Sequence, residues 1–283
     1  MNVLDAVEQR CAALSPMPAV VLRLNEVLAD PHCDAAAVVD AIRYDPALTT
    51  HVLRVANSAE SAASQEVSSV NDAVVRLGNR RVVEIAIANT VQKFFHSQEV
   101  CRADIRKDLW RHAIASALAT ELLARKERAS LRGTLFTAAL LHDVGRLAIN
   151  EFVEQSYERI LELVKTRHAS FVEAEREVLG TDHAQVGNRI AEMQSFPDPI
   201  SRAIRWHHAP DQLETRDPVV EMICLSDVLC GLVGIQSGWD GLASAVPRAL
   251  LDAFQQSQSS LQAFLTDLVA ALRGVEKRFG LSV

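Results

Sequence analysis

Residues 137–150 read TAALLHDVGRLAIN, an apolar run that holds a histidine and an aspartate, His142 and Asp143, near its middle. Apolar residues recur at helical spacing here and along nearly the whole chain, and alternating segments joined by Asn-Gly or Asp-Gly turns are not found. The sequence therefore predicts an all-α fold. Apolar surroundings penalise unpaired charge, so Asp143 needs a partner, and a metal ion or an imidazolium is the least costly kind.

Capping residues and prolines mark helix boundaries on either side of this stretch. Ser69 precedes VNDAVVRL and Gly78 follows it, while Pro46 after Asp45 is typical of a first helical turn. Beyond them, periodicity predicts helices near residues 109–127, 133–150, 154–167, 171–179, 183–194, 198–207 and 218–233. A loop, GIQSGWDGLASAVP, leads from the last of these to a closing helical region rich in Leu and Ala.

A polar, charge-rich stretch, HSQEVCRADIRKD at residues 96–108, separates the two halves of the chain. We place a lobe boundary within it. The predicted organisation is an N-terminal helical lobe at residues 1–98, followed at 99–283 by a second helical lobe with a C-terminal helical extension.

The composition narrows the class of protein. The 283 residues are 49% hydrophobic, which is ample for a substantial core. The formal net charge of -7 argues against nucleic-acid or anionic-membrane binding, and the basic tract at 76–81 lacks the interleaved aromatic residues of a nucleic-acid site.

The first residues do not read as a secretory signal, and no apolar run approaches the roughly 20 residues of a membrane span. We expect a cytoplasmic protein without membrane contact, whose five cysteines are reduced thiols with no assigned role.

Histidines and buried-looking acids gather in the second half of the chain. A lone histidine is usually an ordinary core or surface side chain, and His168 in KTRHAS is expected to be exposed. Imidazole nitrogens and carboxylate oxygens without a thiolate nevertheless form a ligand set suited to iron, manganese, zinc or nickel. Enough candidates are present for two bridged ions: His112, His142, Asp143, His183, His207, His208 and Asp227.

Two of these positions have competing explanations. The pair His207-His208 is also typical of a polar helix end, where an imidazolium favours the helix dipole. Asp108 lies four residues before His112, on the same helical face, and is a candidate additional ligand. An acid near a helix N-terminus is equally expected for dipole reasons.

The order His, His-Asp, His, His-His, Asp resembles the HD superfamily of metal-dependent phosphohydrolases. From about Leu14 to about Leu232 the chain resembles the HD-related output domain, HDOD, in the stretches LSPMPAVVLRLNEVLADP, AIRYDPALTTHVLRVANSA, VSSVNDAVVRLGNRRV and LLHDVGRLAI. The resemblance implies an all-α, multi-helical HDOD fold, with the N-terminal helical lobe packed on an HD-like lobe. Such domains are typical of bacterial signalling proteins.

Resemblance to the related HD-GYP phosphodiesterases implies that the seven candidates occupy ligand positions, but the chain departs from that family twice. Arg146 stands where those enzymes carry a lysine, and we expect it to contact a phosphate. After the histidine pair the chain reads HHAPDQLETRDPVV and lacks the Glu and Gly-Tyr-Pro signature. The sequence therefore argues against hydrolysis of cyclic di-GMP.

Three hypotheses follow for the function. The favoured one is a cytoplasmic regulatory protein that binds one or two divalent metal ions and contacts a signalling partner in trans, since the sequence shows no receiver or cyclase segment. The alternative is a metal-dependent phosphohydrolase, a phosphodiesterase or nucleotidase, in which the metals activate a water and Arg146 steadies the phosphate. The third is an inert remnant whose polar residues satisfy one another. A phosphate-containing small ligand and self-association remain open.

Overall fold

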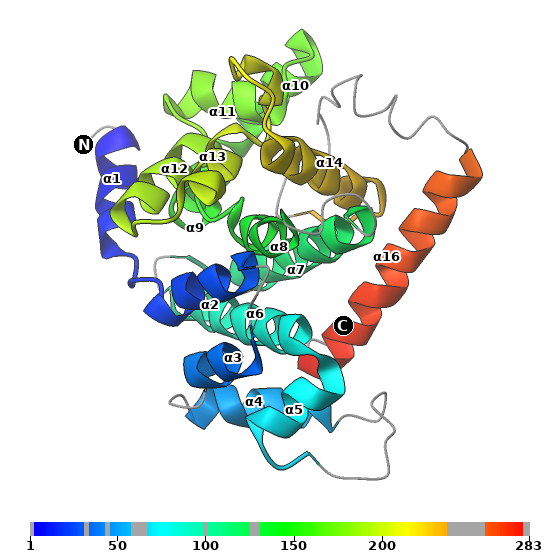
Figure 1. Cartoon of the computed structure of the whole chain (residues 1–283). Helices are drawn as coiled ribbons and strands as arrows, with labels where there is room; N and C mark the ends of the chain where they lie inside the picture. The colour runs from blue at the N-terminus through cyan, green and yellow to red at the C-terminus, as the bar shows by residue number, and fades with distance from the viewer. Residues whose placement is uncertain are drawn as a thin grey trace.

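The computed structural model describes residues 3–30, 34–42, 46–57, 67–98, 101–124, 131–236 and 258–279. Within these ranges the chain forms α-helices, one short 3-10 helix and no strand, which confirms the predicted all-α fold (Figure 1). The first half contains α1 (Val3–Ala13), α2 (Ala19–Ala29), α3 (Ala35–Ile42), α4 (Pro46–Ala56), α5 (Val70–Leu77) and α6 (Asn79–Ser97).

The second half contains α7 (Ala103–Leu123), α8 (Arg132–Leu141), α9 (Arg146–Gln155), α10 (Tyr157–Arg167), α11 (Phe171–Leu179), α12 (His183–Met193), α13 (Asp198–Trp206), η3 (Pro210–Gln212), α14 (Pro218–Leu232) and α16 (Gln258–Phe279). The helix expected near 109–127 begins earlier, at Ala103, so part of the polar stretch at 96–108 is helical. Most of the loop expected before the closing helix lies outside the described residues.

The capping signals of the first half act as predicted. Ser69 and Asp72 form a reciprocal capping box at the start of α5, in which each side chain accepts the other residue's backbone N–H. Gly78 ends α5 with a φ of 83°, a conformation that glycine adopts without steric cost. Pro46 begins α4, as expected. Asp45, the proposed cap before it, lies outside the described residues.

The prediction of a single helix over 133–150 is wrong, because the helix is interrupted at His142–Gly145, between α8 and α9. The break is a succession of tight turns, in which Val144 N–H donates to the Leu141 carbonyl at 3.0 Å and Arg146 N–H to the Asp143 carbonyl at 3.0 Å. Periodicity did not reveal it, since the turn residues are buried like those of a helix. His142 and Asp143 lie within this break.

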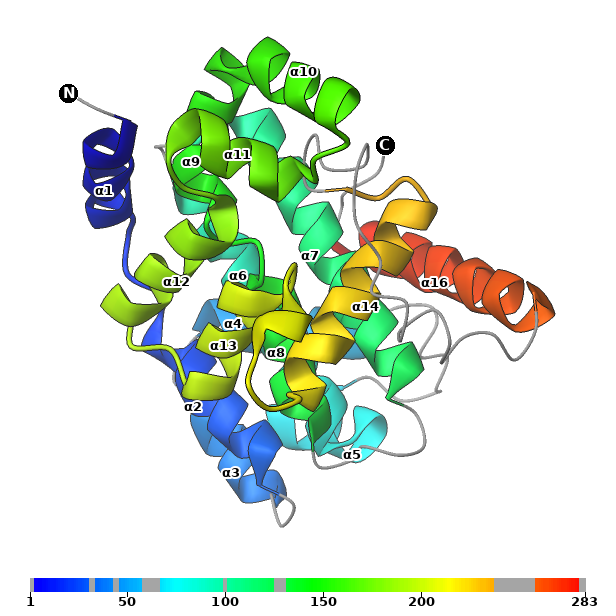
Figure 2. The ribbon, with the colours of Figure 1, turned by 90° about the horizontal axis from the view of Figure 1, so that it is seen from above.

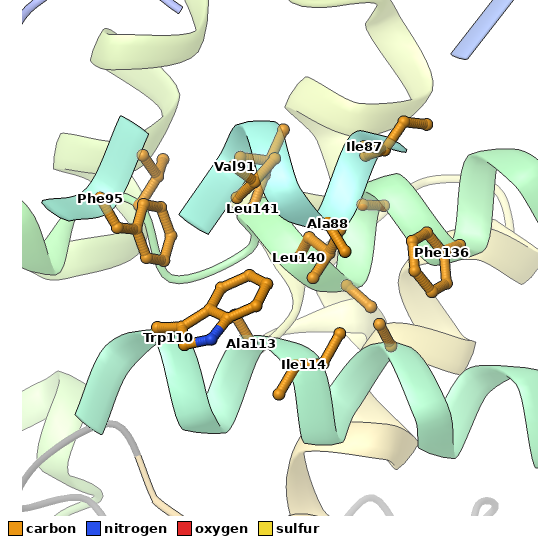
Figure 3. Packing of buried hydrophobic residues seen from close by; sticks show 14 of the residues in the cluster. Ile87, Ala88, Val91, Phe95, Trp110, Ala113, Ile114, Phe136, Leu140 and Leu141 are labelled. Atoms are coloured by element: carbon orange, nitrogen blue, oxygen red, sulfur yellow. The ribbon is translucent and has the colours of Figure 1, made fainter. Parts of the chain in front are cut away.

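Helix α8 lies at the centre of the molecule, in contact with α2, α6, α7, α13 and α14 (Figure 2). Figure 3 shows the core where α6, α7 and α8 meet, built from large apolar side chains and small alanines that let the helices approach closely. Its members include Ile87, Ala88, Val91, Phe95, Trp110, Ala113, Ile114, Phe136, Leu140 and Leu141. The seam between α7 and α8 therefore has a rigid apolar support on one side.

The predicted lobe boundary falls between α6 and α7, and the hydrophobic core continues across it because α6 packs on both α7 and α8. Helix α1 lies far from the other N-terminal helices and packs against α9 and α12 (Figures 1 and 2). Val7 and Cys11 are buried in that contact, and Arg10 pairs with Glu151. The division into lobes at residues 98 and 99 stays a prediction.

The basic tract at 76–81 is tied to carboxylates of the same chain. Arg80 contacts Glu84 on its own helix and Glu121 of α7, the latter at 3.0 Å, and Arg81 contacts Glu84 at 3.3 Å. Burial and the neighbouring Glu84 raise the pKa of the Glu121 carboxyl to about 7. The tract thus joins α6 to α7.

The other expectations from composition concern thiols and membranes. The four cysteines within the described residues, Cys11, Cys101, Cys224 and Cys230, are free and buried. Burial raises the pKa of each thiol well above its usual range. Cys33 lies outside the described residues. Among the described helices none is both long enough and apolar enough to cross a membrane.

We predict that Gly145→Ala severely destabilises the protein, because a Cβ at this position would lie 1.9 Å from the carbonyl oxygen of His183 and 2.5 Å from the backbone nitrogen of Gly187. Rigid backbone cannot yield as a side chain can. The free energy of unfolding, measured in urea without added metal, is expected to fall by about 3 kcal/mol or more, the upper end of overpacking effects.

The matched control is Gly231→Ala in α14, where a Cβ would meet only the end of the Gln236 side chain at 3.9 Å. Replacing glycine by alanine inside a helix is expected to stabilise this variant by roughly 0.5–1 kcal/mol. Equal stability of the two variants would show that α12 does not constrain the turn.

Candidate metal centre

The structure brings all seven candidate ligands together near the C-terminal end of α8. They come from five places in the chain: His112 from α7, His142 and Asp143 from the turn after α8, His183 from the start of α12, His207 and His208 from the end of α13, and Asp227 from α14. Two sets of ligand atoms each lie within 4.8 Å of one another. We call them the His142 group (His112, His142 and Asp143) and the His183 group (Asp143, His183, His207 and His208).

Most of this centre is closed to solvent. His142, His183 and His207 have no exposed surface. Among the seven candidate ligands, two side chains are partly exposed to solvent: His208, by 17%, and Asp227, by 16%. Any small molecule would therefore reach the centre from the side of α14 and the end of α13.

Four of the histidines are held in the same orientation by their Nδ1 atoms. His142 Nδ1 donates to the Ala139 carbonyl at 2.8 Å, and His207 Nδ1 to the Ile204 carbonyl at 2.8 Å. His112 Nδ1 donates to the Ile235 carbonyl at 3.1 Å, and His183 Nδ1 to a Glu175 carboxylate oxygen at 2.7 Å. Because these oxygens only accept, each Nδ1 carries the hydrogen and each neutral ring turns the lone pair of Nε2 inward. Metal-binding histidines are oriented in the same way.

The inward nitrogens of the His142 group face each other. His112 Nε2 lies 3.2 Å from His142 Nε2, and Asp227 Oδ1 lies 3.2 Å from the same His112 nitrogen. Two lone pairs at this separation repel unless a cation lies between them, and Asp227 adds a negative charge beside them. The arrangement therefore calls for a metal ion or a proton.

Protonation differs between the two rings. Burial would lower the pKa of His112, but its hydrogen bond to Asp227 outweighs that effect and raises it. Burial lowers the pKa of His142 to about 4, so this ring is neutral at neutral pH. Of the two rings, His112 is thus the one that favours a proton, beside Asp227.

Asp143 is shared by both groups. Its Oδ2 lies 3.6 Å from His142 Nε2, while its Oδ1 lies 3.4 Å from His183 Nε2 and 3.7 Å from His207 Nε2. Burial alone would raise the pKa of this carboxyl, but the Arg146 guanidinium and the surrounding imidazoles hold it well below its usual range. Asp143 is thus a carboxylate that can ligate on either side.

Arg146 is buried among the site's own side chains. Its Nε lies 3.1 Å from Asp143 Oδ2, its Nη2 3.3 Å from His183 Nε2 and its Nη1 3.9 Å from Glu175 Oε1. The side chain has no exposed surface. The phosphate contact expected for it stays a prediction.

Glu175 on α11 was not foreseen from the sequence. It is fully buried, and its Oε2 accepts both the backbone N–H of His183, at 3.1 Å, and the ring Nδ1–H. It occupies the apolar face of α11 together with Phe171 and Leu179, four residues away on either side. An acid at the centre of such a stripe is a signal that could have revealed it.

Two further residues were weighed from the sequence. Asp108 is exposed on α7 and belongs to neither ligand group. His168 is exposed, as expected, and follows the end of α10 in the left-handed conformation with a φ of 54°.

A family model for the HDOD domain matches residues 14–210. The chain belongs to the HDOD family. A solved HDOD domain protein of unknown function from Geobacter sulfurreducens is 25% identical, covers 96% of this chain and 99% of its own, and superposes with a TM-score of 0.73. This agrees with the resemblance found in the sequence.

Two further solved structures share the fold, and one further protein is similar in sequence. A protein from Marinobacter aquaeolei VT8 assigned to signal transduction is 23% identical, with a TM-score of 0.70 over 99% of this chain and 61% of its own. A protein from Shewanella amazonensis SB2B assigned as a metal-dependent phosphohydrolase is 19% identical, with a TM-score of 0.56 over 95% of this chain and 96% of its own. An uncharacterized Treponema pallidum (strain Nichols) protein is 22% identical over 260 residues, and this chain spans about half of its length, 49%.

In this HDOD protein Glu175 should hold His183 and balance Arg146, so its removal leaves buried polar groups without a partner. We predict that Glu175→Leu lowers the free energy of unfolding by about 3–5 kcal/mol, as when one member of a buried ion pair is lost. Glu175→Gln keeps one accepting oxygen and should lose less, about 1–3 kcal/mol. Urea unfolding at neutral pH measures both.

The control is Glu177→Leu, two residues further along α11, where the carboxylate is 53% exposed and pairs with Arg167 at the surface. This variant should stay within about 0.5 kcal/mol of the wild type. A Glu175→Leu protein as stable as this control would contradict the role given to Glu175.

Proposed function

We propose that this HDOD protein is a cytoplasmic regulatory module that binds a divalent metal ion at its His/Asp centre and acts on another protein in trans. The observation that carries the proposal is the pair of inward Nε2 atoms of His112 and His142, 3.2 Å apart beside two carboxylates. A proton between these nitrogens would relieve their repulsion, and a divalent ion would do so while also balancing the two neighbouring carboxylates.

The donor set fits a borderline metal. His112 and His142 would supply nitrogen, and Asp143 and Asp227 oxygen, which suits iron, manganese, zinc or nickel and disfavours ions that prefer thiolates. A bound ion would act as a Lewis acid that polarises a water or a phosphate oxygen. The protein's own contribution is the fixed Nδ1–H bonds, which orient the rings before any ion arrives.

Burial favours a regulatory role over turnover. A substrate needs access to the metal and room to leave, and here only His208 and Asp227 are partly exposed. A metal enclosed in this way links α7, the α8–α9 turn and α14, and so fixes the relative positions of helices whose outer faces can contact a partner. The similar Marinobacter protein is assigned to signal transduction, and we extend such a role to this chain as part of the proposal.

The metal content of the purified protein tests the proposal. The wild type, purified with manganese or iron in the medium, should hold at least about one ion per chain, because a site of four nitrogen and oxygen ligands binds such ions well. The double variant His142→Ala with Asp143→Ala should fall below about 0.2 ions per chain, since two of the ligands are gone.

The matched control is His168→Ala, which removes an exposed histidine outside the centre and should keep the full metal content. A wild type with less than about 0.2 ions per chain, unchanged in the double variant, would leave the inert remnant as the better description, because a metal role requires an occupied site.

A metal-dependent phosphohydrolase is the second candidate, favoured by one observation. Asp143 offers one oxygen to each ligand group, the arrangement needed to bridge two ions that would clamp a phosphoryl group. We expect the manganese-loaded protein to show no rapid hydrolysis of nucleotides or cyclic dinucleotides. Hydrolysis at hundreds of turnovers per minute, lost in the double variant, would replace the regulatory proposal with the phosphohydrolase. Such a turnover number lies at about the lower end of the range of ordinary enzymes.

A further inference from the structure

We propose that Arg146 is a built-in cation of the centre, so that this chain holds a single metal ion in the His142 group and keeps the His183 group free of metal. The proposal rests on the proposed function, since it assigns the number and place of the ion. Its basis is the position of the guanidinium, which contacts a ligand atom of each group: Asp143 Oδ2 at 3.1 Å and His183 Nε2 at 3.3 Å.

The lone pair of His183 Nε2 is already committed. An imidazole nitrogen has one lone pair, and here it faces Arg146 Nη2 at 3.3 Å and His208 Nε2 at 2.8 Å. Because Nδ1 of His183 donates to Glu175, Nε2 must be the acceptor, so His208 carries its hydrogen on Nε2. Arg146 cannot give up its proton, so a metal could reach His183 Nε2 only if the guanidinium moved away.

The His142 group keeps its full capacity. A carboxylate oxygen has two lone pairs, so Asp143 Oδ2 can pair with the Arg146 guanidinium, 3.1 Å from Nε, and still face the Nε2 atoms of His112 and His142. Asp227 completes this side at 3.2 Å from His112 Nε2. Four ligands therefore remain on one side, whereas on the other side the lone pair of His183 Nε2 is engaged by Arg146 and His208.

The charge acts in the same direction. Arginine cannot be deprotonated in a protein, so the buried guanidinium stays positive at any working pH. Asp143 and Glu175 balance it from opposite ends. The His142 group has Asp143 and Asp227 to balance an ion, whereas the His183 group has only the shared Asp143, so a second divalent ion there would face the guanidinium with less compensating charge.

The test compares two buried histidines with matched geometry. His142 and His207 both have no exposed surface, and each donates Nδ1–H to a helix carbonyl at 2.8 Å. They differ in group: His142 belongs to the side we expect to hold the ion, and His207 to the other. Mn²⁺ alone is the probe, measured as bound ions per chain after gel filtration and by the EPR spectrum.

The wild type should bind about one Mn²⁺ per chain, with the spectrum of an isolated ion, because one complete ligand group is available. His142→Ala should bind at least roughly tenfold more weakly, since it loses a direct ligand. His207→Ala should keep the single ion. Arg146→Met should admit a second ion, seen as about two Mn²⁺ per chain with a spin-coupled spectrum, because both the blocking donor and the fixed charge are gone.

Several outcomes would overturn the assignment. Two ions in the wild type, or equal loss of metal in His142→Ala and His207→Ala, would show that both groups bind, and the proposed function would survive. A folded Arg146→Met that still binds one ion would also refute the role of Arg146. If that variant does not fold, the contrast between the two histidine variants decides alone. No metal in any form would instead overturn the proposed function itself, and the inference with it.

Discussion

The backbone contact between the α8–α9 turn and α12 controls both the packing and the centre. Gly145 lies so close to the carbonyl of His183 and to Gly187 that no side chain fits between them. The same contact sets His183 beside Asp143, 3.4 Å from Nε2 to Oδ1. A shift of one element would therefore open the core and separate the ligand atoms together, so folding and site assembly cannot be varied independently.

The centre concentrates ionisable side chains in an apolar interior, where unpaired charge is costly. The chain limits that cost in two ways. Rings such as His142 are kept neutral by burial, with their Nδ1–H bonds satisfied by nearby oxygens. The full charges are arranged in contact, with Arg146 between Asp143 and Glu175. A site built like this is ordered before it binds an ion, which reduces the reorganisation that binding requires.

Membership of the HDOD family fixes the fold but leaves the reaction open, because a shared fold hosts several functions. The difference between a regulatory and a hydrolytic centre lies in a few side chains. Arg146 fills space and supplies charge on one side of Asp143. Among the seven described candidate ligands, His208 and Asp227 alone are partly exposed to solvent. Under the proposed function, both features favour an ion that organises the helices over one that turns over a substrate.

The sequence by itself determined the helical class, the family and the chemical types in the centre, because helix spacing, the capping at Ser69 and the HDOD stretches are local patterns. It also indicated the His-Asp set, but not its geometry. The break at His142–Gly145, the carboxylate of Glu175 and the burial of Arg146 were decided by tertiary structure alone. Each depends on α11 or α12 packing on the turn after α8, as in the contact of Arg146 with His183, 37 residues away. Periodicity within one segment carries no information about such distant partners.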